Sequence, residues 1–395
     1  MVELLSPGGT MEMVRDALVA GADSVYVGPR AWSRREAAYE LPHHEIREVI
    51  LMAHDRGAKL RVALNADIEA DSHADMLRKV EAYASWGVDG FIMKTPEAMR
   101  AVHARFPEIT IHASVGCNVR DRKAMDRVKE AGATQFVAST ALNTYERIAA
   151  LKRTADEVGL GVELLIHSNR CVTGVGGCRL YDYFEPYFEH EVIHDTDGTK
   201  RLKLIGNPDK GGVCYRPCLG NHIPAIAEKF PAKVLTYLDK SNNEIYNLLE
   251  DVPKYIALGV HTLKIQGREY PTPLIAELTK IYRRLIDETQ RGMADVAAAR
   301  AALDPVLAER DQYRTGKTRQ LHERLMARMS EDLHRRLMVQ MGTTAWDPNA
   351  EEKKLLAAEP SESSLFSRET AREFPESGVP SRVVPVPVPV PVSRA

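Results

Sequence analysis

Short runs of apolar residues alternate along this chain with longer stretches in which apolar residues recur at helical spacing. The short runs have the length and the β-branched content of buried strands, and most are followed by a segment of helical period. Repeated strand-helix units predict an α/β fold with a TIM-barrel-like parallel core. A doubly wound open sheet is the alternative, because a sequence does not show whether a sheet closes. The expected strands are residues 2–5, 24–27, 59–64, 90–93, 109–114, 135–138, 162–167, 234–237 and 262–265.

A long insertion, residues 171–218, interrupts this alternation. Within it the segments EVIH and RLKLI flank a turn from Asp195 to Gly198, which is the pattern of a β-hairpin. We expect this hairpin to return the end of the insertion to its start.

The pattern changes again near the C-terminus. We expect residues 1–290 to form the barrel-like domain that carries the insertion, and residues 291–345 to form a peripheral helical extension. Residues 346–395 end in VVPVPVPVPV, where alternating proline forbids helix and predicts a disordered, extended tail.

Four of the five cysteines stand in two close pairs, Cys171 with Cys178 and Cys214 with Cys218. Such a set of thiolates is typical of an iron-sulfur cluster or a zinc ion. The spacing matches neither the short knuckle of structural zinc nor the ferredoxin run, and glycines between the first pair allow backbone amides to face bound sulfide. The pattern therefore favours iron-sulfur, with zinc as the alternative and four unrelated buried thiols as the plainer interpretation.

The composition narrows the class of protein. The chain has 395 residues, a net charge of −2 and 44% hydrophobic residues, which suits a soluble globular protein. The start, MVELLSPGGT, lacks the pattern of an export signal, and no run of about eighteen apolar residues occurs, so we expect neither export nor membrane insertion. Five cysteines in a chain without an export signal indicate a reducing cytoplasm. The near-neutral charge argues against wide electrostatic binding of nucleic acid.

Several blocks of the sequence resemble the peptidase U32 family. They are ELLSPGGTMEMVRDALVAGADSVYVG, the segment RGAKLRVALN that ends at Asn65, IHAS around His112, the cysteine pairs, and LKIQGRE from Lys264 to Glu269. The resemblance implies a barrel-like core that holds a 4Fe-4S cluster. It also implies membership of a family that includes oxygen-independent hydroxylases of ubiquinone precursors and of tRNA or rRNA bases.

The same resemblance implies roles for particular residues. Arg268 and Asn65 fall on family motif positions at strand ends, where barrel enzymes gather their catalytic groups. The guanidinium of Arg268 suits a carboxylate such as prephenate, the expected oxygen donor, and the alternative for it is a structural salt bridge. The implied cluster ligands are Cys171, Cys178, Cys214 and Cys218.

Four further residues have a chemical and a plainer interpretation. His167, close before the first cysteine pair, is a candidate for a hydrogen bond to cluster sulfur or for action on the substrate. His112 is a candidate base, although a satisfied core histidine is favoured. Arg35 is either an anion contact or a solvated loop residue, and the fifth cysteine, Cys117, is interpreted as a buried thiol.

Three departures from the family pattern predict a substrate different from those of the well-known members. Each replaces a polar or charged group expected after a barrel strand, and they occur at Ser114-Val115-Gly116, at Lys94-Thr95 and at Ser139-Thr140.

These observations predict a cytoplasmic iron-sulfur enzyme that hydroxylates a small aromatic or isoprenoid metabolite without dioxygen. RNA-modifying relatives often carry a further β-rich domain, so hydroxylation of a tRNA or rRNA base is the second hypothesis. A peptidase and a non-catalytic assembly factor are further alternatives, although the sequence contains neither HExxH nor GxSxG. A second U32 subunit is an expected partner.

Overall fold

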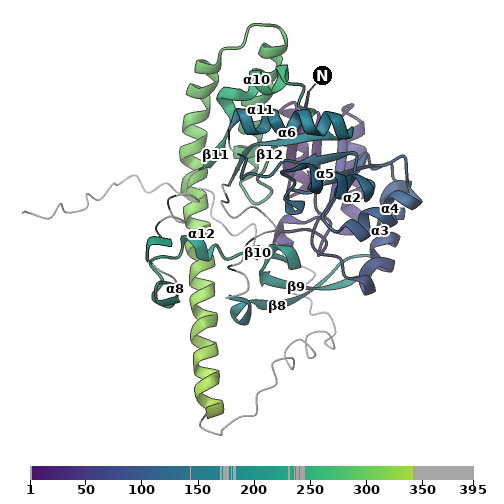
Figure 1. Ribbon diagram of the computed structural model, residues 1–395. Helices are drawn as coiled ribbons and strands as arrows, with labels where there is room; N and C mark the ends of the chain where they lie inside the picture. Colours follow the sequence, from purple (N-terminus) through teal and green to yellow (C-terminus); the bar gives the residue numbers. More distant parts are fainter. Residues whose placement is uncertain are drawn as a thin grey trace, which may run out of the picture.

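Eight parallel strands close into a barrel in the computed structural model, which describes residues 2–142, 144–169, 171, 178, 180, 184–229, 232–234, 236, 240 and 245–340 (Figure 1). Seven strands pair in chain order, and the eighth pairs with both the seventh and the first. The sheet is therefore the closed barrel, and the open-sheet alternative is excluded. The barrel strands are β1 (Glu3–Gly8), β2 (Ser24–Val27), β3 (Lys59–Leu64), β4 (Gly90–Met93), β5 (Thr110–Ala113), β6 (Gln135–Val137), β7 (Gly161–Asn169) and β12 (Thr262–Ile265).

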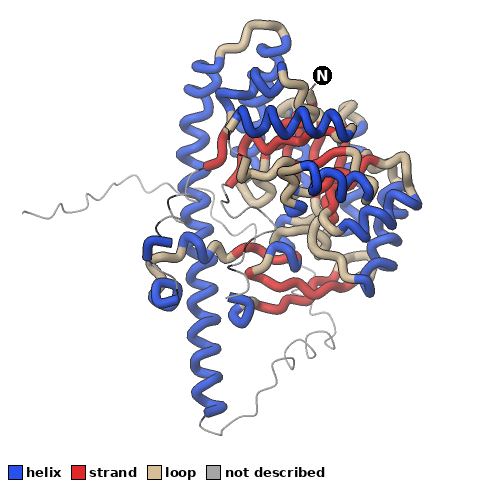
Figure 2. Tube along the Cα trace, viewed as in Figure 1, coloured by secondary structure: helices blue, strands red, loops and turns tan. Residues whose placement is uncertain are grey.

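Helices pack around the outside of the barrel (Figure 2). Local sequence signals fix the ends of these helices. At the start of α1 (Met11–Val19), the hydroxyl of Thr10 accepts a hydrogen bond from Met13 N, and at the end of α6 (Tyr145–Val158), Gly159 adopts a left-handed conformation with φ of 72°. Their apolar faces bury the strand side chains that point outward. These helices are α1 (Met11–Val19), α2 (His43–His54), α3 (His73–Ser85), α4 (Pro96–Arg105), α5 (Arg122–Glu130), α6 (Tyr145–Val158), α10 (Val252–Ala257) and α11 (Thr272–Gln290).

Eight of the nine expected strands are confirmed, and the strand expected at residues 234–237 is wrong. Val234 and Thr236 are helical, while Leu235 and Tyr237 lie outside the described residues. The short strand β11 (Ile245–Asn247) follows and pairs antiparallel with β7. An apolar run of four residues does not by itself distinguish a strand from a buried helical segment, which explains the error.

The insertion contains the expected hairpin. Strands β8 (Glu189–His194) and β9 (Lys200–Gly206) are antiparallel, and β10 (Gly211–Cys214) pairs with β9 in parallel, as Figure 1 shows beside the barrel. The ammonium group of Lys79 on α3 bonds to the carboxylates of Asp195 and Asp197 in the hairpin turn at 2.8 and 2.6 Å. This buried contact fixes the insertion to the barrel. The short helix α8 (Pro224–Lys229) follows the insertion.

The helix α12 (Val296–Gln340) runs along both the barrel and the insertion (Figure 1). The sequence predicted a peripheral helix here, but α12 packs against the cores of both parts. Leu303 on this helix belongs to the main hydrophobic core, whereas Leu321 and Leu325 belong to a second core with Phe184 and Tyr215 from the insertion. The Pro/Val-rich tail lies outside the described residues. Within the described part of the chain, no helix is long and apolar enough to span a membrane.

Candidate active site at the barrel mouth

A cavity of about 220 Å³ opens where the barrel strands end. The carboxyl ends of parallel strands meet at this face, so residues that directly follow strands share its wall. The insertion closes one side and α12 another. The polar lining residues include Asn65, Ser114, Thr140, Gln266 and Arg268 from the barrel, Cys171, Cys214, Arg216 and Cys218 from the insertion, and Arg314 and Lys317 from α12.

The four paired cysteines share one neighbourhood beside this cavity. Cys171, Cys214 and Cys218 line it, and none of the five cysteines is in a disulfide. Burial, followed by the nearby thiols of Cys214, Cys171 and Cys178, raises the pKa of Cys218 well above its ordinary value. The hairpin thus brings the second pair to the first, as the sequence predicted. Among the described residues, no group of three or more His, Cys, Asp or Glu side chains is arranged to hold a metal ion; residues 172–177, between the first pair, lie outside that description.

Arg268 is a buried cation with an unused donor. It follows β12, is 3% exposed, and donates from Nη2 to Ser33 Oγ at 2.9 Å, whereas Nη1 is buried without a hydrogen-bond partner. Gly28 leaves the room for it, because a Cβ there would lie 1.8 Å from Nη1. Burial, together with the nearby Arg35, lowers the pKa of Arg268 to about 10, so the group stays charged at neutral pH. It lines the cavity as a fixed cation.

A chain of buried contacts holds Arg268 in place. Ser33 donates from Oγ to Glu40 Oε1 at 2.6 Å, and Lys203 on β9 donates to Glu40 Oε2 at 2.6 Å. The side chains of Lys203 and Glu40 are 1% and 0% exposed. The cation that faces the cavity is therefore tied to the insertion that carries the cysteines.

Asn65 also lies on the cavity wall. Its Nδ2 is 3.4 Å from Ser114 Oγ, and its Oδ1 is buried without a hydrogen-bond partner. A free amide oxygen is an acceptor for an N–H or O–H of a bound molecule. The structure places Asn65 and Arg268 in one cavity, as expected from their positions after β3 and β12.

His167 does not belong to the cavity lining. Its ring is fully buried, with Nδ1 3.4 Å from both Asn247 Nδ2 and Tyr282 Oη. Burial, and secondarily Arg310, lowers the pKa of His167 well below its ordinary value, so the ring is neutral. The expectation that it acts on the substrate is not supported by this position. A histidine before a ligand cysteine gives no sign of which face of its strand it occupies.

The other candidates separate clearly. Arg35 lines the cavity and pairs with Glu269 at 3.0 Å. His112 is the satisfied core histidine, since its ring nitrogens contact Glu163 and Arg61 inside the barrel. Two of the three departures from the family pattern reach the cavity, through Ser114, Val115 and Thr140. At the third, Lys94 instead pairs with Asp67 and Asp209 at 2.7 and 2.9 Å.

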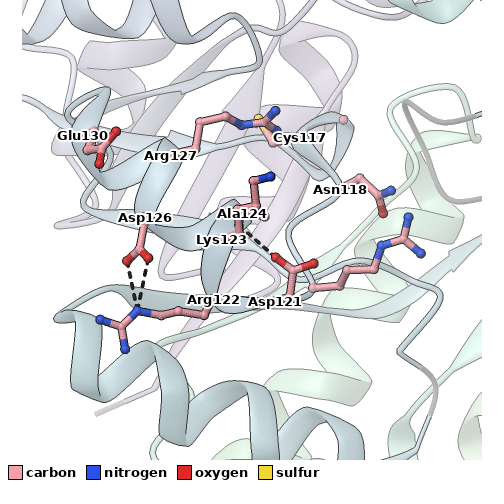
Figure 3. A pocket seen from close by; sticks show the side chains of 11 residues that line it. Cys117, Asn118, Asp121, Arg122, Lys123, Ala124, Asp126, Arg127 and Glu130 are labelled. Carbon is pink, nitrogen blue, oxygen red and sulfur yellow. Dashed lines mark hydrogen bonds and ion pairs between the residues drawn. The ribbon is translucent and has the colours of Figure 1, made fainter.

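Cys117 lies outside the cavity, against a groove on the barrel surface beside α5 (Figure 3). Burial raises its pKa to about 12, which makes it a poor nucleophile. The groove, about 920 Å³, mixes cations with carboxylates: Arg122 pairs with Asp126 at 3.0 Å, and Asp121 caps α5. We assign no chemistry to it.

The sequence did not single out several cations of the cavity, among them Lys264, Arg314 and Lys317. Lys264 carried a usable signal, since a lysine between Leu263 and Ile265 in a strand expected to be buried needs a partner. The two α12 residues carried none, because many charged residues of that helix face water.

The fold and the cavity define the class of the protein: an α/β barrel that gathers cysteine thiols and buried cations at the carboxyl ends of its strands. The model of peptidase family U32 matches residues 9–324, and the chain belongs to that family. The match extends into α12, as expected of a helix that lines the cavity.

Two similar proteins carry names that describe RNA hydroxylation. The "tRNA hydroxylation protein P" of Haemophilus influenzae is 26% identical over 317 residues, covering 73% of this chain and 68% of the relative. The "23S rRNA 5-hydroxycytidine C2501 synthase" of Escherichia coli is 28% identical over 304 residues, covering 75% of this chain and 41% of the relative. The solved structure of a U32 peptidase aligns with 42% of this chain and 69% of its own at 14% identity and a TM-score of 0.38.

Proposed function

We propose that this protein is an iron-sulfur enzyme that hydroxylates a pyrimidine base in RNA without dioxygen. The observation that carries the proposal is a single cavity lined both by three of the paired cysteines and by the fixed, partly unpartnered Arg268. The names of the relatives support RNA as the substrate, and one of them specifies 5-hydroxycytidine. RNA therefore replaces the small aromatic or isoprenoid metabolite favoured by the sequence alone.

The thiols fit a 4Fe-4S cluster in their chemistry. Four thiols gathered beside one cavity repel one another as thiolates, and a cationic centre relieves that repulsion. Cys171, Cys178, Cys214 and Cys218 would hold the cluster, which when bound supplies electron transfer. Zinc on the same thiols is the alternative, and metal analysis distinguishes the two.

Arg268 and Asn65 offer complementary groups to the reacting molecules. The free Nη1 of Arg268 suits a carboxylate, which fits a carboxylic oxygen donor of the prephenate type. The free Oδ1 of Asn65, and the equally unpartnered Oγ1 of Thr140, suit the amino or imino edge of a base. A molecule that satisfies these buried atoms gains hydrogen bonds that the protein's own groups do not supply.

The size of the cavity restricts how RNA can bind. A volume of about 220 Å³ admits small molecules or single bases and excludes a duplex. Enzymes that modify a base inside such a cavity act on single-stranded RNA or turn the nucleotide out of its stack. We therefore place the target in a loop or an unpaired region.

The test compares RNA from the source organism with and without this gene. The tRNA and rRNA fractions are digested separately, and hydroxylated pyrimidine nucleosides are measured by mass spectrometry. We expect one of them to disappear on deletion and to return with the wild-type gene or with Cys117→Ala, but not with Cys214→Ala. Unchanged RNA together with altered quinones would contradict the proposal and restore the small-molecule hypothesis.

A further inference from the structure

The inside of the barrel holds a chain of charged side chains that the proposed chemistry has not used. Lys264 Nζ donates to Glu163 Oε1 at 2.6 Å, and Glu163 Oε2 lies 2.7 Å from His112 Nδ1. Arg61 Nε donates to His112 Nε2 at 3.3 Å, and its two terminal nitrogens pair with Glu3. The first four of these residues are no more than 6% exposed. The chain runs from the amino ends of the strands to the cavity.

The contacts fix the protonation of each member. Because Arg61 donates to His112 Nε2, the ring proton lies on Nδ1 and is donated to Glu163. Burial lowers the pKa of His112, so the ring is neutral. Burial opposes ionisation of Glu163, but Lys264 and His112 outweigh it and bring the pKa of this carboxyl below its ordinary value. Glu163 is therefore a carboxylate that holds Lys264 as a cation.

Lys264 is the member that reaches the cavity. It lines the wall, and its ammonium lies 4.3 Å from the centre of the Tyr26 ring, near which the guanidinium of Arg268 lies at 5.8 Å. Within the described residues, the hydrogen bond of Lys264 Nζ goes to Glu163. An ammonium group has three donors, so two remain for the ring face and the cavity.

Stability alone does not explain a buried lysine here. Replacement of a buried ion pair by apolar residues of similar volume is often neutral or stabilising, so such a pair is weak support for the fold. Perturbed charged groups beside a cavity are instead typical of functional sites.

We propose that Lys264 contacts the substrate, its ammonium donating a hydrogen bond to a carbonyl oxygen or ring nitrogen of the base, while Glu163 and His112 are positioning residues that hold this cation at the cavity. The inference rests on the proposed function, because a pyrimidine is what presents these acceptor atoms. Lys264 thereby favours bases that carry a hydrogen-bond acceptor on the edge that enters the cavity.

The first test compares two lysine variants in the full-length, iron-loaded protein. Lys264→Met removes the proposed donor, and Lys152→Met is the control, because Lys152 on α6 has a similarly buried side chain, 7% against 8% exposed, away from the cavity. Each protein is added to an anaerobic extract of the deletion strain, which supplies RNA and oxygen donor, and initial rates are measured against RNA concentration. We expect Lys264→Met to lower kcat/KM about 100-fold, as for one donor lost from an active site, and Lys152→Met to leave it unchanged.

The second test uses pH, which a merely structural role would not affect. In Glu163→Gln the carboxylate is gone, so burial and the neighbouring cations lower the pKa of Lys264 without opposition. We expect the alkaline loss of activity to begin at lower pH than in the wild type. The charged or titratable groups that face Lys264 are Glu163, Arg61, Arg268, neutral His112, and Tyr26, whose pKa burial raises to about 12.

The outcomes separate the inference from the proposed function. If the wild type hydroxylates RNA and Lys264→Met does so equally well, or if Glu163→Gln keeps the wild-type pH profile, Lys264 does not contact the substrate and only this inference is overturned. If the wild type, loaded with iron, hydroxylates no RNA, the proposed function and the inference fall together.

Discussion

Lys203 Nζ lies 2.6 Å from Glu40 Oε2, and this buried ion pair joins the cysteine-bearing insertion to the arginine of the cavity. Glu40 also accepts hydrogen bonds from Ser33, whose hydroxyl in turn accepts from Arg268. The position of the cation and the position of the thiols are therefore not independent.

The first prediction concerns this pair. Glu40→Gln leaves the Lys203 ammonium buried without its carboxylate, and we expect the free energy of unfolding to fall by about 3–5 kcal/mol. Urea denaturation of the iron-loaded protein measures it. As a control, Glu97→Gln breaks an exposed pair with Arg100 and should cost at most about 1 kcal/mol. Equal losses of unfolding free energy in the two variants would mean that the buried Lys203–Glu40 pair contributes no more to stability than an exposed pair.

The second prediction concerns the thiols. Cys214→Ala, purified without oxygen, should lose most of its iron and sulfide, whereas Cys117→Ala should keep both, because Cys117 lies outside the cavity. Iron and sulfide analysis with absorption and electron paramagnetic resonance spectra measures this. About four irons and four sulfides per wild-type chain are expected for a 4Fe-4S centre. Stoichiometric zinc in the wild type would contradict the iron-sulfur proposal.

The third prediction separates an enzyme from a scaffold. Arg268→Met removes the cation proposed to bind the donor while leaving all four cluster cysteines, so iron content should be retained and hydroxynucleoside formation lost. Arg268→Lys should recover only part of the rate, because an ammonium lacks the planar fork that binds a carboxylate. Full activity of Arg268→Met would show that the donor does not depend on this arginine.

The fourth prediction concerns pH and stability. His167 has a pKa well below its ordinary value in the folded protein. Below about pH 6.5 the unfolded chain therefore binds a proton that the folded protein does not, and stability falls by up to about 1.4 kcal/mol per pH unit for this residue. His167→Gln should reduce the slope of the free energy of unfolding between pH 6 and 5 by that amount. An unchanged slope would mean that the folded protein protonates this ring.

The fifth prediction concerns α12. A chain ending at residue 309 lacks Arg314 and Lys317 of the cavity and Leu321 and Leu325 of the second core. We expect it to lose iron and thermal stability, whereas a chain ending at residue 340 should retain both. Iron content and melting temperature of the two truncations test this. Retained iron in the shorter chain would place α12 at the periphery after all.

The barrel was predictable because its strands are short apolar runs and most of them are followed by a segment of helical spacing. The run at residues 234–237 has the same composition, but Val234 is helical. The local sequence pattern does not show whether a neighbouring strand is available to pair with this run, and a strand forms only where a neighbour offers hydrogen bonds.

The cavity residues were predictable where a polar side chain stands shortly after a predicted barrel strand. Asn65 directly follows β3 and Arg268 comes three residues after the end of β12, and parallel strands bring such residues together. His167 lies in the core for a reason that the sequence does not show: it is two residues after Leu165, which lines the cavity, but the register of β7 against β12 shifts between these two residues. Arg314 and Lys317 depend on how a long helix lies across the barrel, which is a tertiary property.

The pairing of β1 with β12 has a consequence for how the protein is made. Strand β1 cannot pair with β12 until β12, which begins at Thr262, has been synthesised, and that happens after the whole insertion. At about 5–20 residues per second, the 93 positions from Asn169 at the end of β7 to Thr262 take roughly 5–20 s of translation. All four paired cysteines are thus made before the barrel can close, so a nascent chain presents its thiols to the cell while two sheet edges are still open.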